Sequence, residues 1–254
     1  MSFLSKLGIG IGAGVSPSRE VARPIGSNGG RPRTPGPTTA GALGATRPPE
    51  PHESNRFSNG LKELLWNLEG LGRGTLLDLG PAWQTTLSFF IERGFRVSAE
   101  DILREWKDFL VEEENKLRAA AGHLPESVDA TPAGRATRFL AENLHYPNAT
   151  FDAILLWDLL DYLEPALAKQ MVTTLTDLLR AGGVVFAMFH SKKPEGFRRY
   201  RVADSNTLQV ISSPLLCPAQ KVYQNREIQD LFGRYRTMKS FIGRDQLRES
   251  LFIK

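Results

Sequence analysis

The sequence of 254 residues lacks the features on which several protein classes depend. Its single cysteine, Cys217, allows neither a disulfide within the chain nor a cluster of thiolate metal ligands. No stretch approaches the roughly 18 apolar residues that a membrane-crossing helix requires. The four histidines (His52, His123, His145 and His190) show no spacing typical of a metal site. These absences indicate a cytoplasmic protein with no membrane span and no resident metal.

The first 55 residues differ in composition from the rest of the chain. They contain 10 of the 23 glycines and 8 of the 16 prolines, with six Lys or Arg residues against three Glu. Residues 16–54 have almost no large apolar side chains, so they bury too little surface to offset the entropy of ordering. Four glycines in the opening "MSFLSKLGIGIGAGVS" also make a poor core for a signal peptide. The composition predicts a disordered arm over residues 1–55 and a folded domain over residues 56–254.

The positive charge is also concentrated in the arm. The whole chain carries +4, and the arm with its six basic and three acidic residues supplies most of it. Residues 56–254 are therefore close to neutral. A nucleic-acid-binding domain normally concentrates Lys and Arg on one surface, so nucleic acid is not the partner that we expect for this domain.

Helices and strands are expected to alternate from Ser58, which is a predicted N-cap. A strand is predicted for each short apolar run, and a helix where apolar residues recur every three or four positions. The predicted strands are 74–80, 95–101, 135–143, 151–157 and 184–189, and the predicted helices are 59–71, 83–93, 102–121 and 167–183. This alternation predicts parallel strands with right-handed crossovers, which build a doubly wound α/β sheet.

The C-terminal part of the chain breaks this alternation. The segments "RRYRVAD" and "TLQVISS" flank Ser205–Asn206 and predict a β-hairpin. This hairpin belongs to an insert over residues 190–222, which we expect to cover the substrate. "NREIQDLF" then predicts a helix, and "RTMKSFIGR" and "RESLFIK" predict two strands with a short turn between them. Neighbouring strands that are joined so closely are antiparallel.

Three motifs resemble those of the class I S-adenosylmethionine-dependent methyltransferases. Asp78 and Gly80 open a strand-to-helix turn, Gly94 precedes the second strand, and Asp101 lies 23 residues beyond Asp78. "LHYPNATFDAILLWDLLDYL" and "LLRAGGVVFAMF" are similar to later signatures of the family. The resemblance covers residues 58–254 and implies a Rossmann-like, mostly parallel sheet of seven strands with an antiparallel C-terminal pair. It also implies S-adenosyl-L-methionine as the cofactor and methyl transfer as the reaction.

The glycine turn of the family is altered in this sequence. The resemblance implies that Asp78, Gly80 and Ala82 lie against the cofactor, whose carboxylate faces backbone N–H groups at the helix N-terminus. The family's second and third glycines fall at Ala82 and Gln84. Ala82 adds one methyl group, and Gln84 can project into the channel or hydrogen-bond the methionine tail. Both a working site and a degenerate one remain open.

Polar residues after the second and third predicted strands are the candidates for binding the nucleoside. Asp101 is the candidate for accepting both ribose hydroxyls. It is preferred to Glu100 because Glu100 points to the other face of the strand. The alternative is that Asp101 caps the following helix. The acid that often follows the third strand is replaced by Leu140. Glu142 and Asn143, two and three residues later, are the candidates for contact with the adenine amine.

The resemblance also implies that the residues after the fourth strand face the transferred methyl group. Trp157 is a candidate for packing against adenine or substrate, and Asp158 for orienting or deprotonating the methyl acceptor. The alternatives are that Trp157 belongs to the core, and that Asp158 and Asp161 stand at an exposed helix start. The five Lys and Arg residues of 190–204 either favour an anionic acceptor or protect a sheet edge.

Three functional hypotheses follow from these residues. The first is methyl transfer to a small-molecule acceptor. The second is a binding or scaffold module that keeps the fold without the cofactor, as Ala82, Gln84 and Leu140 suggest. The third is a nucleic-acid or protein methyltransferase. It ranks below the first because "LWDLL" stands where many base-modifying members have an Asn-Pro-Pro-aromatic run.

Overall fold

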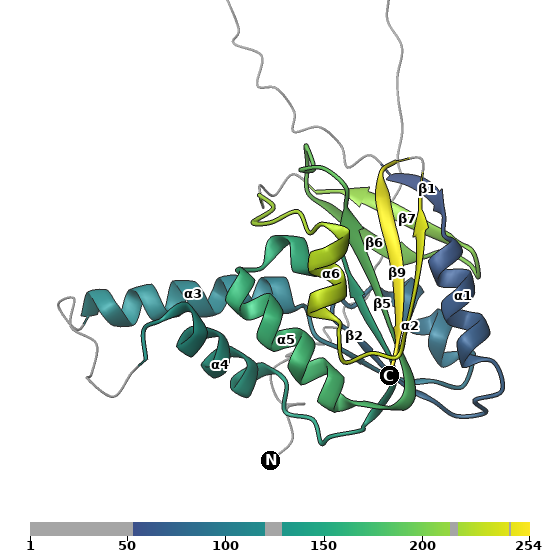
Figure 1. Cartoon of the computed structure of the whole chain (residues 1–254), viewed down its shortest axis with the longest axis horizontal. Coiled ribbons are helices and arrows are strands. Elements are labelled where there is room, and N and C mark those ends of the chain that lie inside the picture. The colour runs from purple at the N-terminus through teal and green to yellow at the C-terminus, as the bar shows by residue number, and fades with distance from the viewer. Residues whose placement is uncertain (1–52, 120–128, 214–217, 244) are drawn as a thin grey trace, which may run out of the picture. The chain divides into compact units, whose positions relative to one another are not determined.

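The computed structural model describes residues 53–119, 129–213, 218–243 and 245–254, which form an α/β domain (Figure 1). Most of the predicted arm, including residues 1–52, lies outside the described residues, as does Cys217. The strands of the main sheet are β2 (Thr75–Asp78), β3 (Arg96–Ala99), β4 (Phe151–Trp157), β5 (Leu179–His190), β8 (Thr237–Ile242) and β9 (Leu247–Ile253).

The main sheet is mostly parallel and has the order β3-β2-β4-β5-β9-β8. Strands β3, β2, β4 and β5 run parallel to one another, whereas β9 is antiparallel to β5 and β8 is antiparallel to β9. The doubly wound sheet and its antiparallel C-terminal pair are therefore confirmed. The sheet has six strands, however, and the predicted seventh is missing from the described residues.

The missing strand is the third one predicted from the sequence, and its residues form a helix instead. Helix α4 (Pro132–Asn143) contains all of "RATRFLAEN". Thr131 caps its N-terminus by accepting a hydrogen bond from the Gly134 N–H at 3.1 Å, and Pro132 suits the first helical position. The prediction of a strand at 135–143 was wrong because this cap starts a helix whose buried residues recur at helical spacing, namely Ala136, Phe139 and Leu140.

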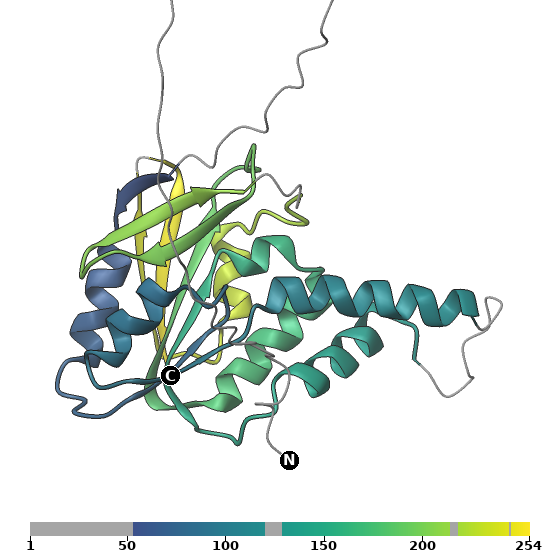
Figure 2. The same cartoon turned by 180° about the vertical axis from the view of Figure 1, so that it is seen from behind.

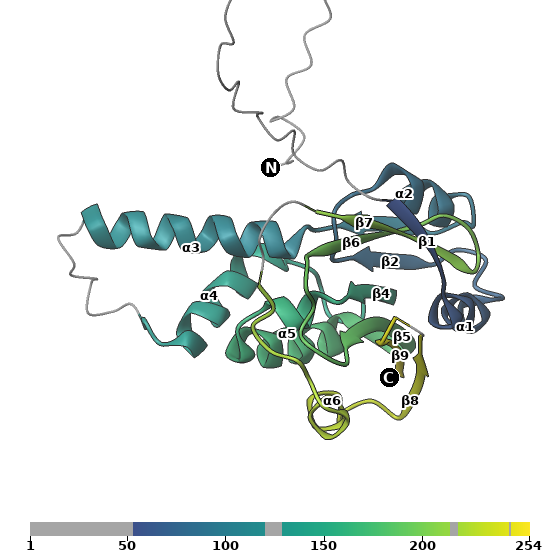
Figure 3. The same cartoon turned by 90° about the horizontal axis from the view of Figure 1, so that it is seen from above.

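Helices cover both faces of the main sheet (Figure 3). On one face lie α1 (Asn59–Leu68) and α2 (Gln84–Ile91), and on the other lie α3 (Ile102–Ala119), α4, α5 (Pro165–Leu178) and α6 (Asn225–Leu231). Successive residues of β4 and β5 face opposite ways, so each strand supplies both cores: Ala153 and Phe186 pack with α1, and Ile154 and Val185 pack with α5. Among the described residues, every helix is too short or too polar to cross a membrane.

A second, smaller sheet is antiparallel and has the order β1-β7-β6. Its strands are β1 (Glu53–Phe57), β6 (Arg198–Val202) and β7 (Thr207–Ser212), and it lies on the α1 and α2 side of the main sheet (Figure 2). The hairpin of β6 and β7 confirms the turn predicted at Ser205–Asn206. Strand β1 was not predicted, and it spans the expected domain boundary at residue 56.

Candidate functional site

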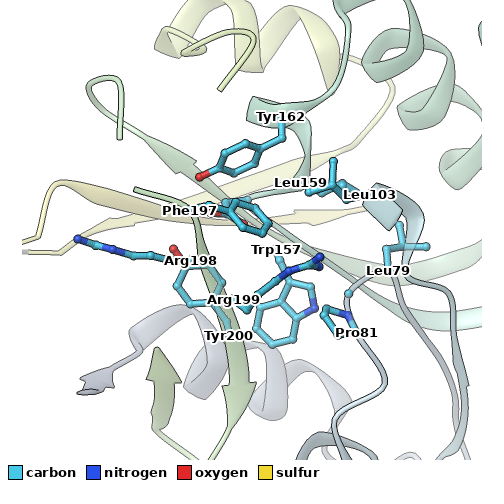
Figure 4. A pocket seen from close by; sticks show the side chains of 12 residues that line it. Leu79, Pro81, Leu103, Trp157, Leu159, Tyr162, Phe197, Arg198, Arg199 and Tyr200 are labelled. Atoms are coloured by element: carbon cyan, nitrogen blue, oxygen red, sulfur yellow. The ribbon is translucent and has the colours of Figure 1, made fainter. Parts of the chain in front are cut away.

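The candidate site lies where the order of the parallel strands reverses. Strand β2 has β3 on one side and β4 on the other, so the crevice between β2 and β4 at their carboxyl ends is the place where sheets of this kind bind ligands. A short 3-10 turn, η2 (Leu159–Tyr162), follows β4. Residues 79–81, 157–159 and 197–200 line the crevice together with Leu103 and Tyr162 (Figure 4).

The Asp78 carboxylate is hydrogen-bonded to both Gly80 and Trp157. The Asp78 carboxylate accepts a hydrogen bond from the Gly80 N–H at 3.0 Å and one from the Trp157 indole N–H at 2.6 Å. Burial raises the pKa of Asp78 to about 6, although these two donors oppose the change. A Cβ atom on Gly80 would lie 2.8 Å from the indole nitrogen. The bare backbone of Gly80 therefore accommodates a side chain of the protein itself.

Asp101 is also paired within the protein. Its carboxylate lies 3.1 Å from the guanidinium of Arg199 on β6 and accepts a long hydrogen bond of 3.4 Å from the Arg104 N–H in the first turn of α3. Asp101 therefore caps α3, as the alternative interpretation predicted, but through a single long hydrogen bond. Glu100 turns away and accepts a hydrogen bond from the Tyr146 hydroxyl, as the alternation along the strand predicted.

Strand β6 forms one wall of the crevice and closes it on that side. The ring of Tyr200 is stacked on the indole of Trp157, with centroids 6.2 Å apart and planes 11° apart (Figure 4). The Val202 N–H donates to the Thr86 hydroxyl on α2 at 3.0 Å. The space that remains is about 20 Å³, which holds roughly one water molecule. Small-molecule sites commonly measure about 300–1,000 Å³.

The residues in this conformation do not fit S-adenosylmethionine. The indole of Trp157 lies over Gly80, and Arg199 is paired with the carboxylate that the sequence assigns to the ribose. The donor has both a nucleoside and an amino-acid part, and neither has room in a cavity of about 20 Å³. Binding therefore requires a rearrangement that opens the crevice.

A buried polar cluster adjoins the crevice at the ends of β4 and β5. The Asp161 carboxylate accepts hydrogen bonds from the His190 backbone N–H at 2.8 Å and pairs with its ring Nδ1 at 2.9 Å. The opposite ring nitrogen lies 3.8 Å from Asp158. Burial raises the pKa of Asp158 to about 7, with His190 opposing the change. Asp158 and Asp161 are thus fully enclosed and do not stand at an exposed helix start.

The remaining predicted residues do not line the crevice. Ala82 is exposed in the turn before α2, and Gln84 is the first residue of that helix, where its side chain donates to Ser88. Glu142 is exposed at the end of α4, and Asn143 donates to the Phe139 carbonyl of its own helix. The adenine contact proposed for Glu142 and Asn143 depended on a strand that is a helix in the structure.

Sequence reasoning missed the roles of Arg199, Tyr200 and the Asp161–His190 pair. The arginines of 190–204 were recognised as a basic cluster, but no local pattern shows that one of them reaches an acid 98 positions away. His190 directly follows the predicted strand 184–189, yet its partner Asp161 lies in the turn that follows a different strand, β4. Among the described residues, no group of three or more His, Cys, Asp or Glu side chains is arranged to hold a metal ion.

The strand directions and helical layers define the class of the fold. A doubly covered, mostly parallel sheet that ends in an antiparallel pair is a Rossmann-like, doubly wound α/β fold, and this arrangement is the one that the sequence resemblance implied.

Comparison with known proteins adds distant structural neighbours. The 1,6-didemethyltoxoflavin-N1-methyltransferase of Burkholderia thailandensis is 17% identical, with 78% of this chain and 79% of that chain covered and a TM-score of 0.40. A SAM-dependent methyltransferase from Aquifex aeolicus is 15% identical, with 78% and 90% covered and a TM-score of 0.40. No protein-family model and no curated protein matches the chain. Likenesses of this size assign this chain neither a family, nor a cofactor, nor an acceptor.

Proposed function

We propose that the domain is an S-adenosylmethionine-dependent methyltransferase that acts on a small-molecule acceptor from an opened form of the crevice. The observation that carries the proposal is the placement of two carboxylates. Asp78 at the end of β2 and Asp101 just beyond β3 flank the point where the strand order reverses. This is where an α/β sheet binds ligands, and the sequence motif assigns both residues to the methyl donor. When bound, the donor would supply an electrophilic methyl group.

The residues of the chain would then bind, orient and enclose the acceptor. Asp158 is 5% exposed on the wall of the crevice, and a carboxyl group with a pKa of about 7 can hold or accept a proton near neutral pH. Trp157, Tyr162, Phe197 and Tyr200 provide an apolar wall that excludes water. A near-neutral domain and a narrow, partly aromatic crevice favour a small acceptor over a nucleic acid.

Two of the three arginines of the insert give little support to an anionic acceptor. Arg199 is paired with Asp101, and Arg201 is bonded to Gln209 at 2.6 Å and paired with Glu53 at 3.3 Å. Strand β6 therefore uses both of these charges in contacts within the domain. Charge protection of an edge fits better, because β6 is an edge strand of the small sheet.

A second candidate function, a scaffold or binding module without cofactor, is favoured by the closed crevice. Both carboxylates that the motif assigns to the donor are bonded to the protein's own side chains. The crevice beside them has a volume of only about 20 Å³. A protein in which this crevice stays closed would use the outer surface of the domain to bind its partners and would need no cofactor.

Isothermal titration of the full chain with S-adenosylmethionine and S-adenosylhomocysteine separates the two candidates. Methyl transfer requires saturable binding of both compounds, followed by methylation in an acceptor screen that contains amines, phenols and carboxylic acids. Absence of heat at millimolar ligand, in the wild-type chain and in a variant that lacks the Arg199 guanidinium, would contradict the enzyme proposal and favour the scaffold.

A further inference from the structure

We propose that strand β6 is a built-in competitor of the ligand for this crevice: Arg199 takes the Asp101 carboxylate, and Tyr200 holds the Trp157 indole over Gly80. The inference rests on the proposed function, because it concerns the same crevice, but its central claim is conformational and can be tested without a ligand.

Two contacts of β6 keep the crevice closed, and we call them together the lock. The first is the ion pair between Arg199 and Asp101. Their side chains are 19% and 23% exposed, so the pair is largely shielded from solvent. The guanidinium also lies 4.8 Å from the centre of the Phe197 ring, which holds it in place by a cation–π contact. A ligand hydroxyl group that binds Asp101 must displace a charged partner from a site with little access to water.

The second contact is the indole of Trp157. It fills the space over Gly80 and donates a hydrogen bond to Asp78 at 2.6 Å. The backbone of Trp157 has φ of 52°, in the left-handed region that bulky residues rarely adopt. Such a conformation persists only where the surroundings impose it. The conformation coincides with a register shift in the pairing of β4 with β5 between Leu155 and Trp157, and the indole that it directs into the crevice packs on the Tyr200 ring of β6.

The way in which β6 is attached allows the lock to open. Within the described residues, β6 pairs only with β7 and forms the free edge of the small sheet. Its backbone is joined to α2 by the hydrogen bond from Val202 to Thr86. Residues 191–197, which lead into β6, contain Gly196, where an added Cβ atom would meet no other atom within 4 Å. Opening therefore breaks side-chain contacts and leaves the main sheet intact.

Hydrogen exchange on the full chain tests the lock. Arg199→Ala should speed exchange of the amides of residues 198–202 by about tenfold or more, since the ion pair that holds β6 is gone. The matched control is Arg201→Ala, which removes an arginine from the same strand but leaves the crevice contacts unchanged. Arg201→Ala should leave exchange at Arg199 and Tyr200 as in the wild type. Equal exchange in the two variants would overturn the inference.

Titration with S-adenosylhomocysteine provides the second readout. If the closed form dominates in the wild type, Arg199→Ala should raise the fraction of open protein. The variant should then bind S-adenosylhomocysteine about tenfold more tightly or better, because the apparent affinity scales with the fraction of open protein. In the Arg199→Ala background, Asp101→Ala should weaken binding and Glu100→Ala should not. Equal affinity of wild type and Arg199→Ala would overturn the competition while leaving the methyltransferase proposal intact. Faster exchange without binding by any variant would support the lock and contradict the proposed function.

Discussion

At the scale of single residues, Gly80 is required by the side chain that lies over it. A Cβ atom at this position would meet the Trp157 indole at 2.8 and 2.9 Å and the Asp78 carboxylate at 3.3 Å. Neither neighbour can move freely, since the indole is hydrogen-bonded to Asp78 and stacked on Tyr200. The glycine that the sequence motif assigns to a cofactor thus has a structural role in the closed form.

Gly80→Ala should therefore destabilise the closed domain. Overpacking of a filled interior typically costs about 1–3 kcal/mol, and we expect the free energy of unfolding to fall by that amount in urea denaturation followed by circular dichroism. Gly72→Ala is the matched control, because a Cβ atom there would meet nothing within 4 Å. Equal stability of the two variants would mean that Trp157 does not occupy the position over Gly80 in solution.

At the scale of elements, strand β1 ties the N-terminal end of the described domain to its C-terminal strand. Its five residues pair with β7, and Arg56 forms ion pairs with Asp245 and with Glu249 of β9. Glu249 is only 2% exposed and also accepts from the Gly60 N–H at 2.6 Å. A buried carboxylate is thus held by a strand that the sequence analysis did not predict and that spans residue 56.

Two truncations test the contribution of β1. Removal of residues 1–52 should leave the melting temperature within roughly 2 °C, a change of a few tenths of a kcal/mol, because the arm has few apolar residues to bury. Removal of residues 1–57 should cost about 3–5 kcal/mol, since Glu249 loses its charged partner. Scanning calorimetry compares the two. A large loss already in the shorter truncation would show that the arm packs on the domain.

At the scale of the whole molecule, buried acids give the fold a characteristic pH dependence. Burial raises the pKa of Asp78 to about 6 and those of Glu105 and Asp158 to about 7. Unfolded Asp and Glu titrate near about 4. The folded protein therefore binds more protons than the unfolded chain between about pH 4 and 7. The stability that these groups contribute is complete below this window and is lost as the pH rises through it.

We expect the free energy of unfolding to decrease from pH 5 to pH 8 through these groups, and Asp158→Asn to flatten the profile. An amide at this position has no charge to desolvate, so the variant should gain stability relative to wild type as the pH rises. Urea denaturation at each pH gives the profile. Asp230→Asn, which changes an exposed carboxylate, is the control. Parallel profiles for wild type and Asp158→Asn would show that Asp158 is solvated in solution.

The sequence by itself determined most of the elements and the class of the fold, because the signals for them are local. Ser58 accepts the capping hydrogen bond from the Leu61 N–H as predicted, and apolar runs such as 151–157 became buried strands. The one misassigned element, α4, also carried a local signal, in Thr131 and Pro132. Position along the chain was likewise enough to bring Asp78 and Asp101 to the same end of the sheet.

Only the tertiary structure decided what those carboxylates contact. Arg199 reaches Asp101 across 98 positions, and Trp157 reaches Asp78 across 79. Neither pair has a periodicity or spacing that marks it, because the first depends on where the hairpin of β6 and β7 packs and the second on the pairing of β4 beside β2. A motif specifies which side chains stand at a strand end, whereas the fold of distant segments specifies whether a ligand or the protein itself occupies the space beside them.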